Sequence, residues 1–345
     1  MRYEALTIKD IAAALHISAS TVSKALRDSY DISEETKKVV KAYAEAHNYR
    51  PNPIAQSLKH GLSRSIGVIV CTIDNHFFSS AINGIESVAY QKGYNVNIAQ
   101  SHESYEREVL ITRHLSSRSI DGFIVSLSAE TSSIDHFKEL HDKGLPMVFF
   151  DRVTPEIVTH QVISNNYKGA YEATRHLIAQ GYRRIAHITS SNLLSITLER
   201  LDGYAQALQD AGLPVDDAYI RYCRHGGMIP EETEQALREL LSLDPRPTAI
   251  MTASDRLSTT AFSLLKSMDV SIPGEMALVG FTNSTSAHIF DPALSTVVQP
   301  AFEMGRQSME LLVRLIEAKR PTTSYETRVL DNELIIRASS KKPEL

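Results

Sequence analysis

The first 50 residues place apolar side chains at the three- and four-residue spacing of short helices. This spacing predicts helices over residues 8–15, 19–26 and 34–47. Thr7 and Ser18 stand directly before the first two helices, where a hydroxyl group can cap free backbone amides. Such short helices need a shared core, which we expect to contain Ile8, Ile11, Ala12, Leu15, Ile17, Val22 and Leu26.

From residue 65 onward, short apolar runs alternate with amphipathic segments. The runs predict strands near residues 66–71, 95–99, 122–127, 146–150, 184–189, 248–253 and 276–281. The amphipathic segments predict helices near residues 79–92, 105–117, 133–143, 167–180, 200–211, 231–242, 255–268 and 302–318. Strands with continuous apolar runs are typical of parallel sheets that helices cover on both faces. The order predicts an α/β body, and its recurrence in both halves allows two similar subdomains.

The first two predicted helices are joined by residues 16–18 alone, which is the spacing of a helix-turn-helix. The second helix would present outward short side chains that permit close approach to a DNA major groove, hydroxyl groups for phosphates and one cation that can reach guanine acceptors. These side chains are Ala19, Ser20, Thr21, Ser23 and Lys24. The spacing alone leaves a second interpretation open, in which the three helices are an ordinary cap on an enzyme.

Charge is distributed unevenly along the chain, whose net charge is -5. The first 60 residues carry nine basic and seven acidic side chains, a net charge of +2. The rest carries 27 basic and 34 acidic side chains, a net charge of -7. This asymmetry adds weak support for a nucleic-acid-binding head on an acidic body.

Several classes of protein lack support in the sequence. No run approaches the roughly 18 apolar residues of a membrane span, and the opening residues lack the pattern of a signal peptide, so we expect a cytoplasmic protein. Cys71 and Cys223 suit reduced thiols better than a disulfide or a redox pair. No phosphate-binding Gly-rich loop, HExxH, paired CxxC or Gly-x-Ser-x-Gly motif occurs, and we expect neither an enzyme nor a metal or cofactor site.

Two segments of the N-terminal region resemble the LacI/GalR family of regulators and occur in the same order as in that family. Residues 7–12 with 17–26 are similar to the headpiece signature of that family, and residues 49–59 are similar to its hinge helix. The resemblance implies that Ala19, Ser20 and Lys24 read bases, and we expect other DNA contacts from Thr7, Ser18, Thr21 and Ser23. It also implies that Leu58 wedges between base steps in the minor groove beside Ala55 and Lys59. Gln56 stands where many relatives have Arg, which removes one phosphate-binding cation.

The resemblance continues through the body and implies a fold like that of periplasmic sugar-binding proteins. It implies a headpiece over residues 1–50, a hinge over 51–62 and a body over 63–345. We expect an N-subdomain of about 63–165 with 297–325 and a C-subdomain of about 166–296 with 326–340. The chain would cross three times between them, and an effector would lie in the cleft.

Ligands of open α/β sheets bind at the carboxyl ends of the strands, which nominates several residues for the effector site. Asp151 beside Arg152 suits an ion pair or a ligand contact better than a catalytic acid, and Arg200 matches an effector-contacting arginine of the family. The full set is Phe77, Phe78, Ser126, Asp151, Arg152, Arg200, Met228, Ser254, Asp255, Thr282 and Asn283. Many relatives carry an aromatic at Met228, Asn at Ser254 and Asp at Thr282, so no relative's ligand can be transferred to this chain.

We therefore hypothesise a nucleoid-associated repressor that binds palindromic double-stranded DNA as a homodimer, with an effector that is a sugar or a sugar derivative. The residues do not determine whether the effector induces release or promotes binding. After the strand-like run at residues 333–337, no leucine heptads suggest a tetramer. The alternative is a cytosolic solute-binding protein that does not read DNA.

Overall fold

The computed structural model describes residues 6–49, 62–191 and 194–342, and the chain divides into two compact units at Arg64. Unit 1 contains α1 (Ile8–Ala14), α2 (Ala19–Ala25) and α3 (Glu34–Ala46), as predicted. Thr7 and Asp10 form the reciprocal capping box at α1, and the Ser18 hydroxyl accepts from the Thr21 amide at α2. The three helices share one small core, with the side chains of Ile11, Val22 and Val40 fully buried.

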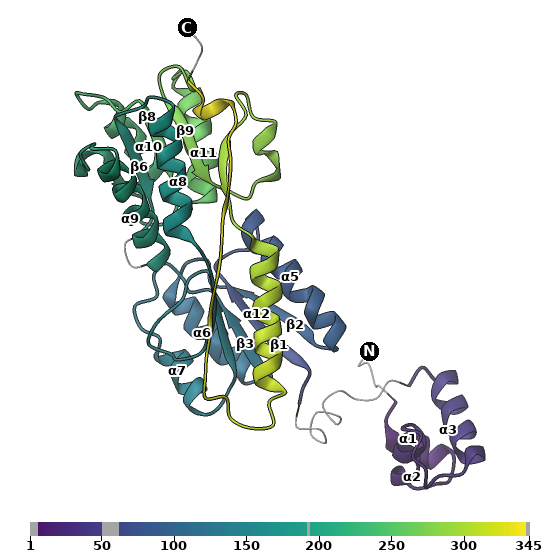
Figure 1. The fold of residues 1–345 in the computed structure, drawn as a ribbon. Coiled ribbons are helices and arrows are strands. Elements are labelled where there is room, and N and C mark those ends of the chain that lie inside the picture. Colours follow the sequence, from purple (N-terminus) through teal and green to yellow (C-terminus); the bar gives the residue numbers. More distant parts are fainter. Residues whose placement is uncertain (1–5, 50–61, 192–193, 343–345) are drawn as a thin grey trace. The chain divides into compact units, whose positions relative to one another are not determined.

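Unit 2 contains two lobes, each built on one six-stranded sheet (Figure 1). The first lobe has the strand order β11-β5-β4-β3-β1-β2, and every pair in it is parallel. Its strands are β1 (Ser65–Val70), β2 (Asn95–Gln100), β3 (Gly122–Val125), β4 (Met147–Phe150), β5 (His160–Ser164) and β11 (Thr327–Leu330). Its helices are α5 (His76–Lys92), α6 (Tyr105–Ser116), α7 (Asp135–Asp142) and α12 (Ala301–Ile316).

The helices cover both faces of this first sheet, as continuous apolar strands require. Val68 and Val70 of β1 pack with α5 and α12, whereas Ile69 packs on the opposite face with side chains of α6 and α7. Gly84 of α5 is needed there, because a Cβ atom at this position would lie 2.0 Å from the Phe302 carbonyl oxygen of α12. The two helices are therefore in direct backbone contact.

The second lobe has the strand order β12-β10-β9-β8-β6-β7. Its strands are β6 (Ile185–Thr189), β7 (Ile220–Tyr222), β8 (Ala249–Thr252), β9 (Ala277–Phe281), β10 (Ser295–Val298) and β12 (Glu333–Ile335). Its helices are α8 (Asn166–Ala179), α9 (Ser195–Asp210), α10 (Pro230–Leu241) and α11 (Asp255–Ser267), with α8 and α9 on one face and α10 and α11 on the other. Short 3₁₀ turns occupy Asp217–Tyr219, Thr285–His288 and Ala338–Ser340.

The structure corrects several predicted boundaries. β12 pairs antiparallel with β10, so the second sheet is not purely parallel. β10 belongs to the second lobe and ends at Val298, and β11 belongs to the first lobe and ends at Leu330, so the predicted changes of subdomain at 297 and 326 were too early. β5, β7, β10 and β11 had no predicted strand. β11 alternates exposed and half-buried residues at a sheet edge, and β10 begins with two polar residues, so neither shows a long apolar run.

One helix start was also misplaced, in a segment that matters for the site. α5 begins at His76 rather than 79, because the Asn75 side-chain oxygen accepts hydrogen bonds from the amides of Phe77 and Phe78 at 2.7 and 3.3 Å. The two phenylalanines therefore lie in the first turn of a helix and not in a loop. Residues 51–61 of the predicted hinge lie outside the described residues.

Candidate functional site

The first candidate site is the outer face of α2 in unit 1. Val22 and Ala25 face the core, whereas Ala19 and Ser20 are exposed in the first turn of the helix. Since the helix is fixed by its own cap and by the small core, these two side chains are held in place without a ligand. Short exposed side chains permit close approach to a major groove, and base reading by Ala19 and Ser20 stays a prediction.

The other predicted contacts in unit 1 already have intramolecular partners. The Ser18 and Thr21 hydroxyls lie 2.8 Å apart, and the Thr7 hydroxyl donates to Asp10 at 2.7 Å. Lys24 Nζ lies 2.5 Å from Asp31 in an ion pair that is more than one third exposed. Exchanging such a pair for a phosphate or base costs little, because exposed pairs contribute only about 0–1 kcal/mol. The predicted roles of Ala55, Leu58 and Lys59 lie outside the described residues.

Sequence reasoning missed one exposed cation beside this face. Arg27 donates from Nε to the Ser23 carbonyl oxygen at 2.8 Å and from Nη2 to the Ser23 hydroxyl at 3.1 Å. Its position four residues after Ser23 on the same helical face was the available signal. Arg27 extends the polar face of α2 with a fixed positive charge.

The second candidate site lies in unit 2, where polar groups of the two lobes meet. Arg200 of α9 is buried and donates from Nε and Nη2 to the Asn166 side-chain oxygen at 2.9 and 2.7 Å. Its Nη1 donates to the Ala253 carbonyl oxygen, and its guanidinium carbon lies 4.1 Å from the centre of the Phe281 ring. Burial lowers the pKa of Arg200 to about 10, although the Asp151 carboxylate opposes this shift.

Asp151 of the first lobe follows the carboxyl end of β4 and interacts electrostatically with Arg200. Burial raises the pKa of Asp151, while the positive charges of Arg152 and Arg200 and a hydrogen bond with Gln299 act in the opposite direction. Asp151 also adopts a left-handed backbone conformation, with a φ of 59°. Strained backbone and shifted pKa values in buried groups are typical of functional sites.

Two polar atoms beside Asp151 have no hydrogen-bond partner among the described residues. Arg152 makes a bidentate pair with Glu103 at 2.6 and 3.0 Å, and its Nε, which lies 3.9 Å from Asp151 Oδ2, has no hydrogen-bond acceptor. Ser126 lies fully buried at the end of β3, and its hydroxyl also lacks a partner. Since buried polar atoms are normally satisfied, these two atoms can each accept or donate one further hydrogen bond at these strand ends.

Sequence reasoning did not give a role to several residues that complete this group. Asn166 donates to Glu199 at 2.9 Å, and Gln299 donates to the Ser164 hydroxyl at 2.9 Å. Burial raises the pKa of Glu199, and its hydrogen bond from Asn166 opposes that shift. Asn166 lay within a segment that resembles the family, but its side-chain partners are distant in sequence. We use the name inter-lobe cluster for Asp151, Arg152, Glu103, Ser126, Arg200, Asn166, Glu199, Ser164 and Gln299.

The remaining predicted effector residues of the second lobe make contacts within the protein. Ser254 caps α11, with its hydroxyl accepting from the Leu257 amide, and Thr282 donates to the Asp255 carboxylate. The Asn283 side chain makes two hydrogen bonds with the Gln299 main chain, since it donates to the carbonyl oxygen at 2.7 Å and accepts from the amide at 3.1 Å. These contacts fix the strand ends of the second lobe.

The three apolar candidates differ in their surroundings. Phe77 and Phe78 are 5% and 3% exposed and belong to the hydrophobic core of the first lobe, where Phe78 packs edge-on to Phe150. Met228 is half-buried in the loop that follows β7. A ligand-facing role for these three residues remains a prediction.

An ion pair also joins the two lobes. Arg256 Nη2 of α11 lies 2.5 Å from Asp74 Oδ1 in the loop after β1.

Among the described residues no helix is long and apolar enough to cross a membrane, and no group of His, Cys, Asp and Glu side chains could hold a metal ion.

Comparisons with known proteins match both units. The family described as "Bacterial regulatory proteins, lacI family" matches residues 7–52, and that described as "Periplasmic binding proteins and sugar binding domain of LacI family" matches residues 63–335. The chain is 33% identical to the HTH-type transcriptional repressor CytR of Escherichia coli (strain K12), over 98% of this chain and 97% of that protein.

Two solved structures of regulators in complex with a sugar are also similar to this chain. The transcriptional regulator CelR in complex with cellobiose is 27% identical, covers 97% of this chain and 99% of its own, and has a TM-score of 0.70. A LacI family regulator of Enterococcus faecium with bound ribose is 27% identical, covers 81% of this chain and 100% of its own, and also has a TM-score of 0.70.

Proposed function

Because this chain belongs to the LacI family of bacterial regulatory proteins, it is a DNA-binding repressor controlled by a small-molecule effector, and we propose that the effector is a sugar or a sugar derivative held by the inter-lobe cluster. The observation that carries this proposal is the electrostatic interaction between Asp151 of one lobe and Arg200 of the other, close to two polar atoms that lack a hydrogen-bond partner among the described residues.

The chemistry of the cluster suits hydroxyl groups. A sugar hydroxyl both donates and accepts, so it can satisfy a carboxylate on one side and a guanidinium on the other. The unpartnered Ser126 hydroxyl and Arg152 Nε would each gain a partner. The cellobiose and ribose held by the two similar regulators support this class of ligand.

A ligand that touches both lobes can control their relative arrangement. Its binding free energy favours the arrangement in which both sets of contacts form, and this preference is the differential affinity that allosteric control requires. We propose that the arrangement determines whether the hinge segments of a homodimer pair on a palindromic operator, with Leu58 at the centre of the site. Asp74 and Arg256 would contribute to the same arrangement.

The operator has its own test, which is a selection of bound duplexes from a random pool at near-physiological salt with the purified chain. One enriched palindrome with a flexible central step would support the proposed site, whereas no enrichment with or without candidate sugars would contradict it.

The wedge has its own test. Leu58→Ala should weaken binding to the selected palindrome much more than binding to random DNA, because only the kinked specific complex accepts the side chain. Equal losses on both DNAs would contradict the wedge. Titration calorimetry with ribose and cellobiose then tests the effector class, and Arg200→Lys is the variant that should lose the response.

A further inference from the structure

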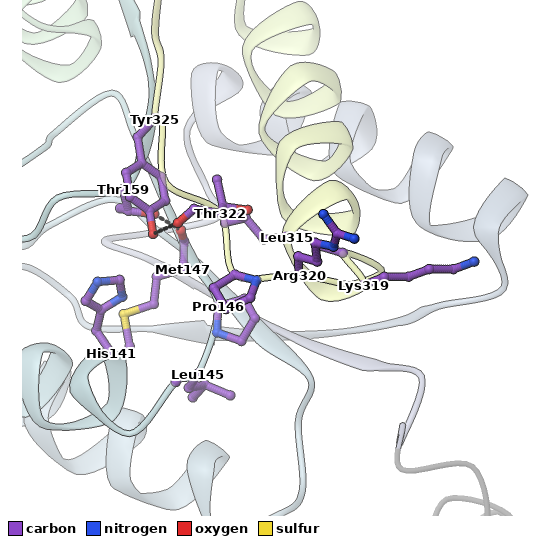
Figure 2. Close-up of a pocket in the computed structure, with 13 residues that line it drawn as sticks. His141, Leu145, Pro146, Met147, Thr159, Leu315, Lys319, Arg320, Thr322 and Tyr325 are labelled. Carbon is purple, nitrogen blue, oxygen red and sulfur yellow. Dashed lines mark hydrogen bonds between the residues drawn. The ribbon is translucent and has the colours of Figure 1, made fainter.

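A pocket of about 460 Å³ lies in the first lobe, away from the inter-lobe cluster (Figure 2). It is formed by the end of α7, the start of β4 and the segment that follows α12. Met147 is the first residue of β4, and Asp151 follows the last, so the pocket and the cluster lie at opposite ends of one strand, roughly 13 Å apart. Its volume lies within the range of roughly 300–1,000 Å³ that small-molecule sites occupy.

The inner wall of the pocket offers mainly apolar surface to a ligand. Leu145, Pro146 and Met147 line it together with the ring of Tyr325, as Figure 2 shows. The polar atoms of this wall are already used within the protein, since the Tyr325 hydroxyl donates to the Thr322 carbonyl oxygen at 3.2 Å and Thr159 donates to that of Met147 at 2.5 Å. The wall therefore suits the apolar body of a ligand.

The charges around the pocket have one sign. Lys319 and Arg320 line one side, and no carboxylate occurs among the described residues that line the pocket. Lys319 and Arg320 have no ion-pair partner among the residues that the structure describes. The nearby Arg314 and Arg328 differ, because both pair with Glu326, at 2.9 and 3.0 Å.

We propose that this pocket is a second ligand site, which binds a small molecule with an anionic group, such as a phosphate or carboxylate, on an apolar or aromatic body. The anionic group would pair with Lys319 and Arg320 at the rim, and the body would cover Met147 and Tyr325. The site would act independently of the effector between the lobes.

Phenyl phosphate, titrated calorimetrically into the full-length protein, is the probe that tests the proposal. We expect saturable binding of one molecule per chain, with inorganic phosphate and benzyl alcohol each weaker by about tenfold, because each offers only one half of the recognition. Lys319→Gln with Arg320→Gln should weaken phenyl phosphate by about tenfold through loss of charge-assisted hydrogen bonds. Ala318→Trp, which fills the pocket from its lining, should abolish binding.

The matched control removes two exposed cations of the same lobe that do not line the pocket. Arg107→Gln with Lys138→Gln makes the same change in net charge and should leave phenyl phosphate affinity within about twofold, since long-range charge is screened. All variants should retain binding to the selected operator, which reports on folding.

Two results would overturn the proposal. One is the absence of saturable phenyl phosphate binding to the unaltered protein. The other is binding that both the Lys319/Arg320 variant and Ala318→Trp leave unchanged, because the two cations would then serve only the carboxyl end of α12, where positive charge is favourable without any ligand.

Discussion

A buried histidine in the second lobe should make the protein less stable in mild acid. His187 of β6 is fully buried and stacks on Tyr204, with ring centres 5.1 Å apart. Its Nδ1 lies 3.1 Å from the Met251 carbonyl oxygen, which can only accept, so Nδ1 carries the proton in the neutral ring. Nε2 has no hydrogen-bond partner among the described residues, so a second proton there would be buried without an acceptor.

This environment sets the direction and the size of the effect. Burial lowers the pKa of His187 from 6.5 to about 4, and the hydrogen bond with Met251 opposes that shift. The unfolded chain therefore takes up this proton at a higher pH than the folded protein does. Stability is fully present above about pH 6.5 and is lost as the pH falls toward about 4, by about 3 kcal/mol in total.

The assay compares unfolding by urea in the unaltered protein and in His187→Asn, followed by circular dichroism from about pH 7 to about pH 4. Asparagine offers an amide donor to the Met251 carbonyl oxygen but does not titrate. The loss of the ring costs the variant a constant amount at every pH. We expect the difference between the two free energies of unfolding to change by about 3 kcal/mol across this range, in favour of the variant.

Other titrating groups should cancel in this comparison. Burial also lowers the pKa values of His160 and His176, but both residues are present in the two proteins. If the two free energies of unfolding run parallel with pH, the neutral buried state of His187 is wrong.

Three further predictions concern the two binding sites. Ser20→Ala should weaken operator binding by about tenfold with an unchanged salt slope, as fluorescence anisotropy at several salt concentrations would measure. Arg27→Gln should reduce that slope by about one, because we expect this exposed guanidinium to contact a phosphate. Identical salt slopes in the two variants would contradict a phosphate contact of Arg27. Arg200→Lys should weaken the calorimetric affinity for an effector sugar by at least about tenfold, because one ammonium cannot replace the guanidinium between Asn166 and Ala253; retained affinity would place the effector elsewhere. Asp74→Asn removes the inter-lobe ion pair with Arg256, in which the Asp74 side chain is 66% exposed and that of Arg256 is 32% exposed. It should therefore change effector affinity by no more than about fivefold, and a hundredfold loss would contradict the small contribution of an exposed ion pair.

The sequence by itself determined the elements whose causes are local. The helix-turn-helix follows from caps that join residues three apart and from apolar positions three or four apart, so Thr7, Ser18 and the spacing across residues 16–18 were sufficient. The buried strands of the body were equally clear, because continuous apolar runs of four to six residues have few other uses. The same runs located the carboxyl strand ends that Ser126 and Asp151 directly follow, whereas Arg200 was nominated by the family resemblance. The effector-binding role of all three residues stays a prediction.

Only the tertiary structure decided how these residues pair. Glu103 and Arg152 are 49 positions apart, and Gln299 reaches Ser164 across 135 positions, distances over which no local period carries information. The edge strand β11 and the short strand β10 also form because a neighbouring strand offers hydrogen bonds, whereas their own side chains show no long apolar run. The unpaired state of Lys319 and Arg320 belongs to this class as well, since a cation is free or paired according to which carboxylates the fold brings near it.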